Sequence, residues 1–147
     1  MIVDLFPEAE AHTRGDLWVF VEPDGVALCG DLWFGACEPY LGGGSASGAI
    51  EAIGHLRGSG AGVYLPGHGP AGAMDPTPGA DPVERYCAWL LDQVATLESL
   101  EDEELAALVR SRYEAQRERP NGISFPVAVP GFLEESVKAA VRDVRGG

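Results

Sequence analysis

The stretch VYLPGHGPAG, residues 63–72, joins a strand-forming run to a stiff corner that carries a histidine. The apolar run 63–65 predicts a strand, and Pro66 is expected to end it because proline lacks the N–H that a strand ladder needs. His68 then stands between two glycines, with Pro70 behind it. The corner is either a turn that contains a histidine or a rigid segment that holds a ligand-binding histidine in place. The second interpretation requires further ligand side chains elsewhere in the sequence.

Two other segments place polar side chains at the ends of predicted strands. His12 lies in the stretch AHTRGD, residues 11–16, and Asp31 follows the strand-like residues 26–29 after a single glycine. In α/β sheets, binding and catalytic residues are often found in the loops at strand ends. Two imidazoles and a carboxylate are ligand types for Zn²⁺ or a similar transition metal. His12, Asp31 and His68 have no local spacing such as HExxH, so three turn residues without a ligand remain the alternative.

The first half of the chain has the pattern of an α/β layer. The run 17–21 is apolar throughout and is expected to be buried on both faces, and residues 22–25 predict a turn that makes a hairpin with the next strand. Apolar residues at spacing three predict a helix that begins near Ser45 or Ser47, either of which can serve as its N-cap. The predicted strands are residues 2–6, 17–21, 26–29 and 63–65, and the apolar face of the helix spans residues 50–56.

The second half is helical. Residues 73–82 form a connector rich in proline, glycine and aspartate, and Asp81 followed by proline is a typical helix start. Helices are predicted over 83–97, 102–117 and 132–144, with Ser99 as a cap between the first two. The predicted organisation is therefore an α/β layer over residues 1–72, a linker over 73–82 and a helical C-terminal extension over 83–147.

The composition restricts the classes of partner that are expected for this chain. The 147 residues carry a formal net charge of −13. An acidic chain repels nucleic-acid phosphates and anionic membrane surfaces, so neither is an expected partner and a small-molecule substrate is favoured. Three cysteines without a CxxC pair indicate a reducing compartment. The N-terminal residues do not have the pattern of a signal peptide, and the predicted location is the cytoplasm.

The ordered segments AHTRGDLWVF, GVALCGDLWF and VYLPGHGP resemble the C-terminal half of the metallo-β-lactamase-fold hydrolases. The resemblance implies half of an αβ/βα sandwich, extended here by C-terminal helices. It also implies that His12 binds one metal ion, that His68 binds a second, and that Asp31 bridges both and is the catalytic residue. One or two zinc ions are the implied cofactor, with iron or manganese as alternatives, and metal-assisted hydrolysis of an ester, thioester or lactam is the implied chemistry.

One departure from that family is clear. Its HxHxDH motif, which supplies further metal ligands, occurs nowhere in the sequence. Each metal would then have one histidine and the shared Asp31, fewer than the three protein ligands typical of catalytic zinc. We therefore expect a hydrolase that is incomplete without an HxHxDH-bearing half, whether that half is supplied by another chain or lost by truncation. The open sheet would be covered by such a half or by a homo-oligomer. The alternatives are a non-catalytic interaction module and a weak mononuclear metal-binding protein.

Other residues near the three candidates have simpler interpretations. Asp16 could orient a ligand histidine, although a turn role is the more common one for aspartate. The glycine-rich stretch 41–48 is expected to be a flexible loop beside the substrate rather than a phosphate-binding loop. His55 belongs to no motif, and a solvated position is expected for it.

Overall fold

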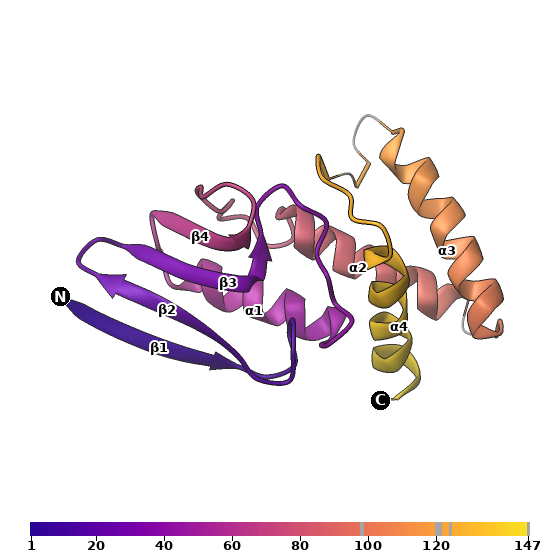
Figure 1. Ribbon diagram of the computed structural model, residues 1–147, viewed down its shortest axis with the longest axis horizontal. Coiled ribbons are helices and arrows are strands. Elements are labelled where there is room, and N and C mark those ends of the chain that lie inside the picture. Colours follow the sequence, from indigo (N-terminus) through magenta and orange to yellow (C-terminus); the bar gives the residue numbers. More distant parts are fainter. Residues whose placement is uncertain (98, 120–121, 124, 147) are drawn as a thin grey trace.

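The computed structural model describes residues 1–97, 99–119, 122–123 and 125–146. In this part of the chain, a four-stranded sheet is followed by a helical layer (Figure 1). The strands are β1 (Ile2–Glu8), β2 (Asp16–Glu22), β3 (Val26–Phe34) and β4 (Val63–His68). The helices are α1 (Ala46–Gly58), α2 (Pro82–Thr96), α3 (Asp102–Arg117) and α4 (Phe132–Arg145). The α/β class predicted from the sequence is confirmed.

The sheet has the order β1-β2-β3-β4. β1, β2 and β3 are antiparallel neighbours, and the predicted hairpin is present, with Val21 paired to Val26. β3 and β4 are parallel, and α1 provides the crossover between them. This order places the ends of β3 and β4 side by side.

Two predicted strand ends were wrong. β3 continues through Asp31 to Phe34, and β4 continues through Pro66 to His68, which pairs with Phe34. Proline is tolerated there because β4 is an edge strand of the sheet, where the missing N–H need not break a ladder. Asp31 and His68 therefore lie within paired strands rather than in free loops.

The two faces of the sheet differ in burial. On the inner face, Ala27, Cys29 and Tyr64 are buried, and the Tyr64 hydroxyl donates a hydrogen bond to the carbonyl of Leu56 in α1. On the outer face, Leu28 pairs with Leu65, and both side chains are more than a third exposed. The prediction that β2 is buried on both faces was wrong, because no described element covers its outer side, where Leu17 is 51% exposed.

α1 lies behind the inner face of the sheet, and the other helices continue beyond the end of the sheet (Figure 1). α2 packs on α1, and α4 packs on α2. Ser45 caps α1 by accepting from the Gly48 N–H, and Asp81 caps α2 by accepting from the Val83 N–H, as predicted for both. Ser99 is not a cap, because α3 follows Glu101. Within the described residues, no helix has the length and apolar character needed to cross a membrane.

Two glycines allow β3 and β4 to meet closely beside Asp31. Gly30 has φ of +54° and lies at an irregularity in the β3–β4 register. Gly67 lies against the Asp31 carboxylate, so that a Cβ added there would overlap Asp31 Oδ1 and lie 2.9 Å from the Gly30 carbonyl carbon. The position of the Asp31 side chain thus depends on the absence of a side chain at residue 67.

Glu38 is a buried carboxyl that joins the sheet to the helices. It follows β3, is 3% exposed, and accepts hydrogen bonds at 3.4 Å from the Tyr86 hydroxyl in α2 and from the Val129 N–H. Burial raises the pKa of this carboxyl above its ordinary value. The folded protein therefore binds a proton at Glu38 more tightly than the unfolded chain does.

We predict that Glu38→Gln makes the protein more stable at neutral pH. Burial raises the folded-state pKa of Glu38. The contribution of Glu38 to the free energy of unfolding is therefore fully present below the unfolded-state pKa, and it is lost as pH rises through the folded-state pKa. Urea unfolding of both proteins across pH 4 to 8, roughly the range that brackets a raised carboxyl pKa, measures this. The variant should lose less stability as pH rises, and an unchanged slope would contradict the prediction.

We predict that Gly67→Ala lowers the free energy of unfolding by about 1–3 kcal/mol, as expected for overpacking at a close contact. The added methyl group would also displace the Asp31 carboxylate. Gly72→Ala is the matched control, because a Cβ there meets nothing within 4 Å. Urea unfolding measures the stabilities, and equal effects of the two substitutions would count against the close approach described above.

Candidate metal centre

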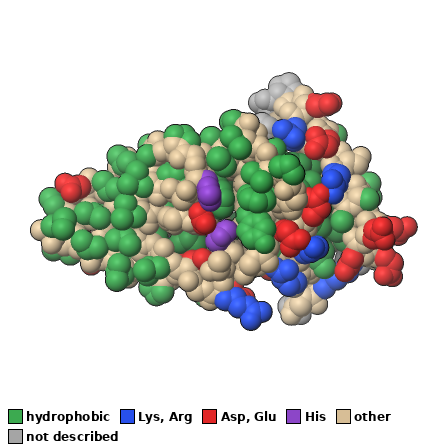
Figure 2. All heavy atoms as spheres, in the orientation of Figure 1, with side chains coloured by type: hydrophobic (Ala, Val, Ile, Leu, Met, Phe, Trp, Pro, Cys, Tyr) green, Lys and Arg blue, Asp and Glu red, His purple; other side chains and the backbone are tan. Residues whose placement is uncertain are grey.

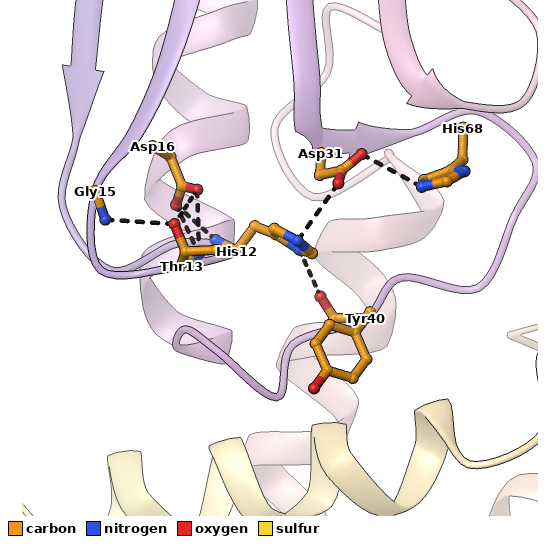
Figure 3. Close-up of polar contacts among 7 residues, drawn as sticks. All are labelled: His12, Thr13, Gly15, Asp16, Asp31, Tyr40 and His68. Carbon is orange, nitrogen blue, oxygen red and sulfur yellow. Dashed lines mark hydrogen bonds and ion pairs between the residues drawn. The ribbon is translucent and has the colours of Figure 1, made fainter.

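The three side chains singled out from the sequence meet at the end of the sheet (Figure 3). Asp31 lies between the two histidines: His12 Nε2 is 3.5 Å from Asp31 Oδ2, and His68 Nε2 is 3.5 Å from Asp31 Oδ1. Each imidazole therefore faces a different oxygen of one carboxylate. The side chains of His12, Asp31 and His68 are 17%, 38% and 63% exposed, so the cluster is most buried at His12 and open to solvent at His68.

A backbone carbonyl orients the His12 ring. His12 Nδ1 lies 2.8 Å from the carbonyl oxygen of Tyr40. Because a carbonyl can only accept, Nδ1 carries the proton, and in the neutral ring Nε2 presents a lone pair toward Asp31. This contact could not be predicted from the sequence, because a backbone acceptor has no signature in the residue types.

Asp16 organises the loop that carries His12. Its carboxylate accepts from the backbone N–H of His12 at 2.8 Å and from the N–H of Thr13 at 2.9 Å, and it also accepts from the Thr13 hydroxyl at 2.7 Å. These contacts are with the backbone and Thr13 rather than with an imidazole. Asp16 therefore fixes the position of the His12 main chain, while the Tyr40 carbonyl fixes the direction of the ring.

The His68 corner is held against the end of β3. The His68 ring stacks on Phe34 with centroids 5.5 Å apart, and the His68 carbonyl accepts from the Gly35 N–H at 2.9 Å. Gly69 has φ of +89°, and a Cβ there would overlap the Gly35 carbonyl oxygen. The glycine that follows the histidine is thus required both by backbone conformation and by close packing.

Helix α4 supports the loop that contributes the Tyr40 carbonyl. The Ser136 hydroxyl donates to the Pro39 carbonyl at 3.3 Å, and the Arg142 guanidinium donates to the carbonyls of Gly42 and Gly44. Phe132 packs on the Tyr40 ring with centroids 5.1 Å apart. The C-terminal helices are therefore connected to the candidate site through the loop 39–45.

The glycine-rich stretch is anchored at the start of α1. Asp143 of α4 accepts from the Ser45 hydroxyl and from the backbone N–H of Ser47, both at 3.0 Å. The negative charge that the N-terminus of a helix favours is therefore supplied by the protein itself. The stretch was expected to be a flexible loop, and in the structure several hydrogen bonds connect it to α4.

The chemistry of the cluster fits part of a metal site. The separations of 3.5 Å between Nε2 and carboxylate oxygens exceed those of ordinary hydrogen bonds. With the His12 proton on Nδ1, a lone pair and a carboxylate oxygen face each other, an arrangement that a cation between them would stabilise. Among the described residues, however, no group of three or more His, Cys, Asp or Glu side chains could hold a metal ion by itself. The Asp31 carboxylate thus has one imidazole beside each of its oxygens. This arrangement offers some of the ligands of a metal site but not a complete coordination shell.

Comparison with known proteins gives a structural likeness only. No family model matches the chain, and no curated protein sequence matches it. The crystal structure of a metallo-beta-lactamase family protein from Thermus thermophilus is similar, with a TM-score of 0.66 at 18% sequence identity over 97% of this chain. A metallo-beta-lactamase from Pontibacter korlensis matches 58% of this chain and 40% of its own length, at 20% identity and a TM-score of 0.45.

The chain spans 44% of the length of the Thermus thermophilus protein, so the likeness concerns one part of that structure. At this level of identity the similarity establishes the fold alone. Taken with the order of the strands and helices, it confirms the resemblance drawn from the three sequence segments: this chain has the fold of part of a metallo-beta-lactamase family protein.

Proposed function

We propose that this chain supplies one half of a metal-dependent hydrolase centre, with His12, Asp31 and His68 as its metal ligands. The observation that carries the proposal is the placement of Asp31, whose two oxygens each face the Nε2 atom of a different histidine at 3.5 Å. A carboxylate in that position suits a bridge between two cations. When bound, zinc or a similar divalent ion would supply Lewis-acid activation of water and polarisation of a substrate carbonyl or ester.

The residues of this chain would hold and orient part of the metal site, but they would not complete it. The Tyr40 carbonyl holds the Nδ1 proton of His12, which leaves Nε2 free to bind a metal. Asp16 fixes the backbone of the same residue, and the stacked ring of Phe34 limits rotation of His68. The ligands that are still needed for a catalytic site would come from a segment that carries HxHxDH.

The outer face of the sheet supports a partner beside this centre. Hydrophobic side chains gather over the sheet, on the same face of the molecule as histidine side chains (Figure 2). Its exposed side chains, on the face opposite α1, are Val3, Leu5, Leu17, Leu28, Val63 and Leu65. Exposed apolar patches of this kind mark interaction sites. We propose that a complementary half bearing HxHxDH covers this face, with a second copy of the chain as the alternative occupant.

Ester, thioester and lactam substrates remain the proposed class, because an activated water can attack a carbonyl in each of them. The second candidate function, a non-catalytic interaction module, is favoured by the same apolar face. The two candidates differ in whether the chain binds metal, so a measurement of metal affinity separates them.

We predict that the untagged protein binds Zn²⁺ only weakly at neutral pH, as an incomplete ligand set would, and that Asp31→Asn weakens this binding further by more than about tenfold, because the substitution removes the charge shared by both sites. Isothermal titration calorimetry measures the affinity. Asp24→Asn, in the β2–β3 turn, is the charge-matched control and should bind like the original protein. Failure of the unmodified chain to bind Zn²⁺, Fe²⁺ or Mn²⁺ would leave the interaction module as the better proposal.

We predict that the double substitution Leu28→Gln and Leu65→Gln abolishes association through the outer face, because it places two polar groups at the centre of an apolar contact. Sedimentation velocity measures self-association and binding to a polypeptide that carries an HxHxDH half. Leu108→Gln, on α3, is the control, because Leu108 is 36% exposed but lies away from the sheet. A monomer that binds no such half, with or without the substitutions, would contradict the proposed role of this face.

A further inference from the structure

We propose that a second surface, on the inner face of the sheet, binds a basic amphipathic helix of a partner protein. We call it the β1–β2 groove. It lies between strands β1 and β2 and the last turns of α1, and its volume is about 610 Å³. The residues that line it are Asp4, Phe6, Pro7, Glu8, Trp18, Phe20, Glu22, Gly54, His55, Gly58 and Ser59. The groove shares no residue with the His12–Asp31–His68 cluster, so this inference does not depend on the proposed hydrolase function.

The floor of the groove is aromatic. Phe6 and Trp18 form a stacked cross-strand pair, with ring centroids 4.2 Å apart and an interplanar angle of 14°. Phe6 is 38% exposed, and Phe20 lies beside the pair and is partly buried. Trp18 itself is buried, whereas Phe6 and Phe20 remain partly exposed, because α1 lies mainly over β3 and makes few contacts with β1 and β2. A sheet face of this kind is normally completed by a second helix.

The rim of the groove is acidic and offers unpaired carboxylates. Asp4 and Glu22 line the groove, and neither makes a hydrogen bond or an ion pair with another described side chain. Glu8 is already engaged, because it accepts from Trp18 Nε1 at 2.9 Å and pairs with His55 Nδ1 at 2.9 Å. Of the described residues that line the groove, none is a lysine or an arginine. Carboxylates beside exposed aromatic rings favour cationic side chains, through charge pairing and cation–π contacts.

The remaining wall favours a helix as the occupant. α1 presents Gly54 and Gly58 to the groove, and a Cβ added at either position meets nothing within 4 Å. Glycines one turn apart allow a neighbouring helix to approach closely. A helix with an apolar stripe would place the stripe on Phe6 and Phe20, and basic residues beside the stripe would reach Asp4 and Glu22. Helix-in-groove binding of this kind is a recurring mode of recognition.

The test uses synthetic helical peptides of about 18 residues as probes, long enough for several turns. One peptide carries a leucine stripe flanked by lysines, a second carries glutamates in place of the lysines, and a third has the composition of the first in scrambled order. Calorimetric titration into the full chain is expected to show binding of the first peptide only. Equal binding of the scrambled peptide would indicate general charge attraction to this acidic chain and would overturn the proposal.

Two sets of variants locate the binding. Asp4→Asn with Glu22→Gln is expected to weaken binding about three- to tenfold, as loss of two exposed ion pairs would. Glu103→Gln with Glu104→Gln, on α3, removes the same charge and should have little effect. Gly54→Leu is expected to block the groove without unfolding the protein, because the position is open and leucine favours a helix. Binding of the first peptide that survives Gly54→Leu unchanged would overturn the groove as its site.

Discussion

The parallel pairing of β3 with β4 is the contact on which the candidate site depends. It places the end of a strand that carries Asp31 against the end of a strand that carries His68. The approach is close enough that residue 67 must be a glycine for the carboxylate to fit. His12 reaches the same carboxylate from the loop between β1 and β2, so segments far apart in sequence converge only when the sheet has formed. Any change in the β3–β4 register would separate the three side chains.

The molecule has two apolar surfaces with different surroundings. The exposed hydrophobic side chains of the outer face are aliphatic and come from all four strands, which suits the face of another sheet or a second copy of the chain. The β1–β2 groove is aromatic and acidic, which suits a basic element. A net charge of −13 strengthens attraction of any basic partner and opposes self-association, so the two surfaces would respond oppositely to added salt.

Much of the fold could be predicted from the sequence, and the failures have physical causes. Short apolar runs predicted the strands and three-residue spacing predicted the first helix. Asp81, and Ser45 as one of two candidates with Ser47, could be predicted as caps because their side chains perform a local task. The ends of β3 and β4 were misjudged because Gly30 and Pro66, which usually interrupt strands, are accommodated by an irregular register and an edge position. The burial of β2 was misjudged because composition does not say whether an apolar face is covered within the same chain. The three candidate ligands were found as residue types at strand ends, but their separations depend on tertiary packing.

The hydrogen bond from His12 to the Tyr40 carbonyl makes the orientation of the imidazole independent of the side chain at position 40. The hydrogen bond is made by the main chain, so any residue at position 40 preserves the acceptor, and substitution of that side chain reports on packing against Phe132 instead. The direction of the imidazole is therefore encoded in the path of the loop 39–45, which α4 holds through Ser136 and Arg142. Helix α4 contributes none of the three candidate side chains, yet it governs the orientation of His12. The candidate site is therefore more sensitive to the packing of α4 than to the identity of the residue at position 40.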